Sequence, residues 1–350
     1  MPVGCRLATG YLGVTLFWLK ERGLLPCAGT ACFLMDYLGA TLTGQRPVTD
    51  PTCAASSGVF DVQEGHWDLQ ALAALGLLPA MLPQIASSGA VLGKLTPSMA
   101  AATGLPAGAS VFMGLGDNQA SFLGSAANRD ETVLVNVGTG GQVAAFTSRY
   151  TYDPLLETRP YPGEGYLLVS AGLCGGASYA LLERFYQQVA LQLFHAKSNE
   201  SIYQIMNELA ATVPSGADGL RCEPFFSGTR AAPELRGSWT GMSVENFTPA
   251  HWTRALLEGM ARALHNGYRQ IERVTGRGRT RLVGSGNGVR ENPVLTSILG
   301  DEFGLPVFLP IHREEAAYGA ALLAAVGAGI FNDLPAAGRL IRYVASMNTR

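Results

Sequence analysis

The apolar positions of this chain change period along its length, between the runs typical of strands and the three-to-four spacing typical of helices. Helical spacing predicts helices over residues 12–20, 31–42, 69–75, 201–211, 249–274, 293–303 and 315–326. Short apolar runs predict strands over residues 111–115, 132–137, 142–146, 281–283 and 307–309. Because the two kinds of element alternate, we expect an α/β fold in which helices cover sheets.

A polar turn at Asn128 to Glu131 separates two long series of these elements. We place the domain boundary there, which gives domains over residues 1–130 and 131–350. A length of 350 residues agrees with this division, since a typical domain has about 150 residues. Within the second domain, residues 214–247 are predicted to be a loop, and Pro249 marks the first position of the helix that follows.

The composition excludes several classes of protein. Hydrophobic residues make up 47% of the chain, charged residues 15%, and the net charge is -2. A disordered chain is more polar than this, and a protein that binds nucleic acid through its charge is more basic, so we expect no nucleic-acid partner. The uncharged run from Gly165 to Leu182 is nearly long enough to span a bilayer, but glycines and serines interrupt it, and we expect no association with a membrane.

Cysteine and histidine spacing bears on compartment and metal binding. The six cysteines include no C-x-x-C pair, which argues against a disulfide scaffold or a zinc cluster and favours a cytoplasmic protein. The five histidines include no pair four residues apart, so no metal site of this chain's own is predicted. The apolar run from Leu7 to Leu19 could be mistaken for a signal peptide, but the charged residues after it favour an ordinary helix.

Asp117 is the first candidate for chemistry. It follows the predicted strand over residues 111–115 and precedes a helix. Active sites of α/β proteins collect at the carboxyl ends of strands, where an aspartate can act as a general base. An N-cap of the following helix would have the same sequence, and one residue can serve both purposes.

Two glycine-rich turns are the next candidates, in a chain whose 43 glycines exceed the usual share of about 7%. The turn from Gly138 to Gly141 offers bare N–H groups and one hydroxyl, which suits a phosphate, although a plain hairpin turn would look similar. The turn from Gly284 to Gly288 lies between a strand and a helix, where a ligand could rest on flat backbone. It lacks the G-x-G-x-x-G spacing and the acidic residue of a dinucleotide site, which disfavours a nicotinamide-dependent oxidoreductase.

Taken together, one carboxylate in the first domain and two glycine turns in the second favour phosphoryl transfer, a reaction in which the protein mainly positions groups and neutralises charge. Paired glycosidase carboxylates and a G-x-S-x-G nucleophile elbow are not found in the sequence.

Short motifs also occur in a familiar order along almost the whole chain. They are Asp36-Tyr37-Leu38, Leu42-Thr43-Gly44, Thr49-Asp50, Ala54-Ala55-Ser56, Phe60 to Asp68, Gly116 to Ala120, Asn136 to Gly140, Gly175 to Ser178, Leu282 to Gly286 and Glu315 to Ala321. In this order they resemble the FGGY family of carbohydrate kinases. Within it, Thr9-Gly10-Tyr11, Thr15 to Leu19 and the surroundings of Asp117 and Gly284 look most like the sedoheptulokinase group. Xylulokinases and glycerol kinases share the same plan.

The resemblance implies an actin-like, ribonuclease H-like ATPase fold of two domains, with sugar held mainly by the first and ATP mainly by the second. Asp117 would be the general base that takes the proton from the sugar hydroxyl, and Asn118 would join it in contacting the sugar. The residues implied to contact ATP are Gly138, Thr139, Gly140, Gly176, Gly284, Ser285, Gly286 and Asn292. Magnesium would arrive with the nucleotide and bridge its phosphates.

The chain departs from the family pattern at its beginning. Members open with a strand, an Asp-x-Gly-Thr-Thr turn and later a Gln-Met-His motif, and neither motif occurs here. On that pattern the first domain would be incomplete by roughly a hundred residues or more. We therefore expect exposed apolar faces on helices such as the one over residues 12–20, with homo-oligomerisation as one consequence. The alternative to an active kinase of sedoheptulose or a related ketose or polyol is an inactive remnant that still binds adenine nucleotides.

Overall fold

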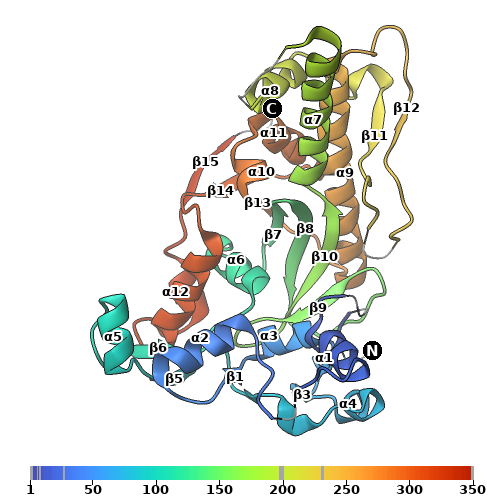
Figure 1. Cartoon of the computed structure of the whole chain (residues 1–350). Coiled ribbons are helices and arrows are strands. Elements are labelled where there is room, and N and C mark those ends of the chain that lie inside the picture. Colours follow the sequence, from blue (N-terminus) through green and yellow to red (C-terminus); the bar gives the residue numbers. More distant parts are fainter. Residues whose placement is uncertain are drawn as a thin grey trace. The chain divides into compact units, whose positions relative to one another are not determined.

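The computed structural model describes residues 3–5, 7, 9–26, 28–196, 201–229 and 232–347 (Figure 1). The chain forms two compact units. Unit 1 contains residues 1–130, 146–168 and 314–342, and unit 2 contains residues 131–145, 169–313 and 343–350. The chain therefore changes unit at the polar turn after Asp130, and two later segments return to unit 1.

The core of unit 2 is a mixed sheet. Its strands are β7 (Thr132–Val137), β8 (Gly140–Thr147), β10 (Tyr166–Cys174), β13 (Arg281–Ser285), β14 (Val307–Pro310) and β15 (Tyr343–Met347). The order in the sheet is β15-β14-β13-β7-β8-β10-β9. The last strand, β9 (Glu157–Pro160), and residues 166–168 at the start of β10 belong to unit 1. β13 pairs in parallel with β7 and β14, and β7 pairs antiparallel with β8. The predicted strands over residues 132–137, 142–146, 281–283 and 307–309 are confirmed.

The helices of unit 2 are α7 (Gly176–Phe194), α8 (Tyr203–Ala211), α9 (Pro249–Thr275), α10 (Asn287–Arg290) and α11 (Pro293–Phe303). α9 begins where the predicted signals lie, with Pro249 in its first turn and the Thr248 side chain accepting the N–H of His251. Thirteen of its 27 residues are buried, which makes it the central helix of this unit. α7 and the ribbon β11–β12 lie beside it (Figure 1).

One prediction in unit 2 was wrong. Residues 214–247 are not all loop, because they contain the short helix η3 (Ala217–Gly219) and the antiparallel strands β11 (Arg221–Glu223) and β12 (Ser238–Thr240). These strands are only three residues long, too short to leave a recognisable alternation in the sequence. Cys222 is fully buried, and its carbonyl oxygen lies against Gly259 of α9, so packing on that helix holds the ribbon.

Unit 1 is built from short elements. Its helices are α1 (Leu12–Glu21), α2 (Leu34–Thr43), α3 (Pro51–Ala54), η1 (Ala55–Ser57), α4 (Leu69–Leu75), η2 (Pro79–Met81), α5 (Pro97–Thr103), α6 (Asp117–Ser125), α12 (Glu315–Gly327) and α13 (Leu334–Gly338). Besides β9, its strands form pairs: β1 (Val48–Thr49) with β4 (Gln84–Ile85), β2 (Phe60–Asp61) with β3 (His66–Trp67), and β5 (Val91–Lys94) with β6 (Ser110–Phe112).

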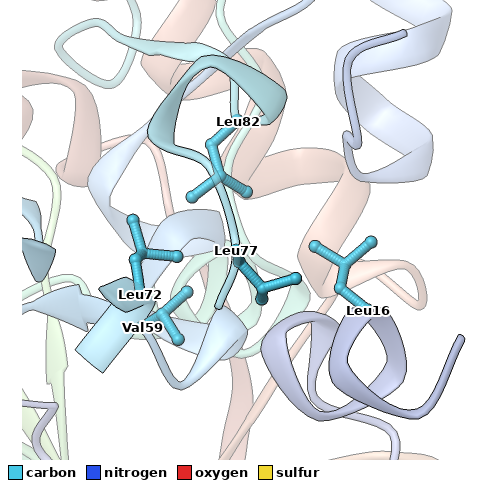
Figure 2. Close-up of a cluster of buried hydrophobic side chains, with 5 residues drawn as sticks. All are labelled: Leu16, Val59, Leu72, Leu77 and Leu82. Carbon is cyan, nitrogen blue, oxygen red and sulfur yellow. The ribbon is translucent and has the colours of Figure 1, made fainter. Parts of the chain in front are cut away.

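A small apolar core holds the first part of unit 1. Figure 2 shows Leu16, Val59, Leu72, Leu77 and Leu82 pointing toward one another, all of them buried. From α1, Leu16 is buried in this cluster and the partly buried Leu12 packs against it, and the helix buries two of its ten residues. Trp18, on the same helix, stays 51% exposed. α1 therefore carries more apolar side chains than this core buries.

The strand predicted before Asp117 is shorter than expected. Residues 111–115 were predicted to form one buried strand, whereas β6 ends at Phe112 and residues 113–115 have no regular structure. β6 pairs only with β5 and is partly exposed, so the apolar run is not the centre of a sheet. Met113 and Leu115 are nevertheless buried, which explains why these positions are apolar.

α6 and α12 cross at glycines. A Cβ on Gly124 would lie 2.0 Å from the carbonyl oxygen of Glu315, and one on Gly319 would lie 2.0 Å from that of Ala120. Only residues without a side chain allow the two backbones to approach this closely. The helix that begins at Asp117 is thus fixed against α12.

None of the helices in the described ranges combines the length and the hydropathy that a bilayer span requires.

Candidate active site

Unit 2 contains a cavity of about 610 Å³ at the ends of β7 and β13. Gly138 and Thr139 line it from the turn between β7 and β8, and Gly176 lines it from the start of α7. Tyr179, Leu257, Met260 and Leu295 make an apolar wall. One rim of bare backbone beside an apolar wall suits a ligand with a charged end and a flat apolar end.

The β7–β8 turn is bonded to the start of α7. The N–H groups of Gly176 and Ala177 donate to the carbonyl oxygens of Gly138 and Thr139, at 2.8 and 2.9 Å. Gly138 also donates its N–H to Gly140, at 3.0 Å. These donors are therefore occupied within the turns. By contrast, the N–H and hydroxyl of Thr139 make no hydrogen bond to any described residue, and Thr139 is exposed on the cavity.

Several glycines around this cavity are required by close backbone contacts. A Cβ on Gly175 would lie 2.3 Å from the carbonyl carbon of Gly140. Gly286 has a φ of +80°, and a Cβ there would lie 2.6 Å from the carbonyl oxygen of Val137. These contacts bring the three turns of unit 2 together, and they leave no room for side chains.

Not every predicted ATP-contacting residue lines the cavity. Gly138, Thr139, Gly176 and Asn292 do. Ser285 is 1% exposed and accepts a hydrogen bond from Asn136, at 2.9 Å, so it joins β13 to β7. Gly140, Gly284 and Gly286 are absent from the lining as well, and Gly286 shapes the turn from behind.

Asn292 has a defined structural bond. It is the N-cap of α11, and its Oδ1 accepts the N–H of Leu295 at 2.9 Å. Its side chain is 6% exposed and faces a cavity whose other polar residues include Asn207, Asn287 and Glu291.

Tyr179 and Tyr203 form the aromatic part of the wall. Their rings stack with centroids 5.5 Å apart and planes 16° apart. The Tyr179 hydroxyl donates to Oδ1 of Asn207 at 2.6 Å. Burial raises the pKa of the Tyr179 phenol well above its usual value, so it stays a neutral donor. Sequence motifs did not reveal these residues, because they lie on helix faces where an ordinary core residue looks the same.

Asp117 lies in unit 1, at the first position of α6. The N-cap of this helix is Gly116, so the alternative that Asp117 is itself the cap was wrong. Its carboxylate accepts the N–H of Asn118 at 2.7 Å and is otherwise exposed. A carboxylate at a helix N-terminus is stabilised by the helix dipole and available to a ligand.

Asn118 and Gln119 follow Asp117 and are buried. Asn118 is 4% exposed, and neither atom of its amide finds a hydrogen-bond partner among the described residues. Gln119 donates from Nε2 to the carbonyl oxygen of Pro160 at 3.1 Å. The predicted sugar contacts, Asp117 and Asn118, are therefore one exposed carboxylate and one enclosed amide.

Comparison with known proteins identifies the family. Residues 3–124 match the N-terminal domain of the FGGY family of carbohydrate kinases, and residues 133–328 match its C-terminal domain. This chain belongs to the FGGY family of carbohydrate kinases. The resemblance drawn from the motifs is thus confirmed, and the family is ATP-dependent.

Relatives include human sedoheptulokinase, which is 32% identical over 327 residues that cover 91% of this chain and 67% of the relative. Autoinducer-2 kinase of Klebsiella pneumoniae is 30% identical over 347 residues, which cover 94% of this chain and 63% of the relative. This FGGY chain therefore spans about two thirds of the length of these relatives.

Solved structures share the fold. Xylulose kinase from Rhodospirillum rubrum is 27% identical with a TM-score of 0.86, over all of this chain and 70% of its own. Plasmodium falciparum glycerol kinase with ADP is 19% identical with a TM-score of 0.81, over 99% of this chain and 69% of its own. The predicted two-domain sugar kinase fold is confirmed.

Proposed function

We propose that this FGGY kinase transfers the γ-phosphoryl group of ATP to a hydroxyl of a sugar, with Asp117 as the general base. The observation that carries the proposal is the cavity of unit 2, where an exposed turn with a free hydroxyl and N–H meets an aromatic wall. A nucleotide has the same two parts, a phosphate chain and a flat base.

In this proposal the base and ribose occupy the apolar wall beside Tyr179 and Asn292, and the phosphates approach Thr139. In this proposal the three glycine turns allow the nucleotide to approach the backbone closely. Among the described residues no three His, Cys, Asp or Glu side chains gather into a metal site. In this proposal Mg²⁺ would arrive with ATP and would supply neutralising charge.

Asp117 is proposed to accept the proton of the sugar hydroxyl as its oxygen attacks the γ-phosphorus. The carboxylate of Asp117 accepts one internal hydrogen bond and is otherwise exposed, so a sugar hydroxyl can reach it. Sedoheptulose or a related ketose or polyol is the proposed substrate. The human relative named sedoheptulokinase supports the first choice, and the xylulose kinase structure supports including pentuloses in a test.

Sugar-dependent release of ADP tests this proposal. Wild-type protein with Mg-ATP is assayed against sedoheptulose, xylulose and glycerol, and Asp117→Asn is compared with Asp301→Asn, an exposed carboxylate on α11. We expect one sugar to give turnover, Asp301→Asn to match wild type, and Asp117→Asn to lose about a hundredfold or more in kcat. Substantial turnover by Asp117→Asn contradicts the base assignment, and ATP binding without turnover of any sugar contradicts the kinase proposal.

A further inference from the structure

Asp50 is a carboxylate without exposed surface in unit 1. It is the N-cap of α3, and its Oδ1 accepts the N–H of Cys53 at 2.9 Å. The Thr52 hydroxyl donates to it at 2.8 and 2.9 Å from the two oxygens, and the Ser88 hydroxyl donates to Oδ2. Buried carboxylates need such donors, because without them their burial is strongly unfavourable.

These donors fix the direction of the Thr52 hydroxyl. The Thr52 hydroxyl donates to both carboxylate oxygens of Asp50, so its hydrogen points at Asp50. The lone pairs of the same oxygen are then free, and Thr52 accepts the N–H of Gly116 at 2.7 Å. Donation to Asp50 polarises the hydroxyl, which strengthens the bond that the hydroxyl accepts.

Gly116 is the residue before Asp117 and the N-cap of α6. A Cβ there would lie 2.7 Å from Oε1 of Gln119 and 3.5 Å from the carbonyl oxygen of Thr52, so the turn is closely packed as well as hydrogen-bonded. Residues 64 positions apart in the sequence are thereby joined at the point where α6 begins.

We propose that Asp50 and Thr52 are positioning residues, which hold the turn that carries Asp117 in the geometry needed for proton transfer. Neither residue touches substrate in this account. The inference rests on the proposed function in that Asp117 is the base, but the bond from Gly116 to Thr52 can be tested separately.

The chain offers a matched control. Thr43 is also a buried threonine of unit 1, 7% exposed, whose hydroxyl donates to Gly39 at 2.8 Å and accepts the N–H of Gln45 at 3.3 Å. Thr43→Val thus removes the same groups as Thr52→Val, but the partners of Thr43 are Gly39 and Gln45 instead of Asp50 and Gly116. Thr52→Ser keeps the hydroxyl, and Asp50→Asn keeps the shape while allowing the Thr52 hydroxyl to turn round.

Two readouts are measured on the full chain. The first is kcat and KM for ADP release with the sugar that gives turnover. We expect Thr52→Val to lose about ten- to a hundredfold in kcat with KM for ATP unchanged, Asp50→Asn to lose less, Thr52→Ser to restore most of kcat, and Thr43→Val to resemble wild type. Equal kcat values for Thr52→Val and Thr43→Val overturn the proposal.

The second readout is amide hydrogen exchange of the peptide that contains Gly116, measured by mass spectrometry. We expect exchange of this amide to be at least about tenfold faster in Thr52→Val than in Thr43→Val or Thr52→Ser. Unchanged exchange overturns the proposal. If wild type turns over no sugar, the proposed function fails and exchange alone decides whether Thr52 holds the turn. If Thr52→Val does not fold, Asp50→Asn provides both readouts.

Discussion

The candidate nucleotide site of unit 2 and the turn before Asp117 in unit 1 are held by different forces. In unit 2, glycine backbones touch one another, as Gly175 and Gly140 do, and no side chain fits between them. In unit 1, the turn before Asp117 is held by a hydrogen-bonded relay: the backbone N–H of Gly116 donates to the Thr52 hydroxyl, and that hydroxyl donates to Asp50. A steric contact fails when an atom is added, whereas a hydrogen-bonded relay fails when one is removed.

The largest effect that sharpens this comparison is expected at Gly175. Gly175→Ala places a Cβ 2.3 Å from the carbonyl carbon of Gly140, and backbone cannot rotate away as a side chain can. We expect unfolding free energy to fall by about 3 kcal/mol and ATP affinity to fall more than tenfold, measured by denaturant unfolding and calorimetric titration.

Gly138→Ala is the matched control for Gly175→Ala. A Cβ at Gly138 meets only Oδ1 of Asn136, at 4.0 Å, although Gly138 lines the cavity. Stability is expected to change by no more than about 1 kcal/mol. Equal loss of stability in both variants would show that backbone contact does not hold these turns.

Gly319→Ala tests a steric contact inside unit 1, next to the relay. The added Cβ would lie 2.0 Å from the carbonyl oxygen of Ala120, so α6 and α12 must move apart. We expect thermal unfolding to show a loss of about 1–3 kcal/mol, with lower kcat because α6 carries Asp117. Ala321→Ser, on the exposed side of α12, should leave both unchanged. A stable, fully active Gly319→Ala protein would contradict the close crossing.

The smallest expected effect is a pH dependence of the unfolding free energy, caused by Asp36 in unit 1. Burial raises the pKa of Asp36 to about 6 from its ordinary 3.8, and the charge of Asp50 adds to this, while the N–H of Phe33 opposes it. The folded state thus holds the proton more tightly than the unfolded state, so unfolding free energy falls as pH rises from about 4 to about 6.

Asp36→Asn removes that titration and keeps an acceptor for Phe33. The difference in unfolding free energy, variant minus wild type, should increase by up to about 2 kcal/mol from pH 4 to pH 7. Denaturant unfolding at both pH values measures it. Parallel pH profiles for the two proteins would show that Asp36 does not titrate in this range.

Several elements of the fold were predictable from the sequence. The strand over residues 132–137 and the helix over residues 293–303 have the bounds that the sequence predicted, because buried runs, Pro293 and Gly304 mark them. The prediction failed at β11 and β12, whose order comes from packing on α9, and before Asp117, where buried residues 113–115 form no strand. A local sequence pattern does not indicate which distant elements a segment packs against.

The candidate site was also predictable in part from the sequence. Glycine turns mark the cavity rim at Gly138 and Gly176, because backbone contact restricts the residue type. Tyr179 and Asn207 were missed, since a tyrosine on a helix face is usually a core residue. The relay through Thr52 was also hidden, because its partners are far apart in the sequence.

Titration of ATP into Asp117→Asn and Gly175→Ala, each against wild type, tests most directly whether nucleotide binding belongs to unit 2. The account predicts a wild-type Kd for Asp117→Asn and a Kd raised more than about tenfold for Gly175→Ala. Weakened binding by Asp117→Asn, or wild-type binding by a folded Gly175→Ala protein, would contradict it.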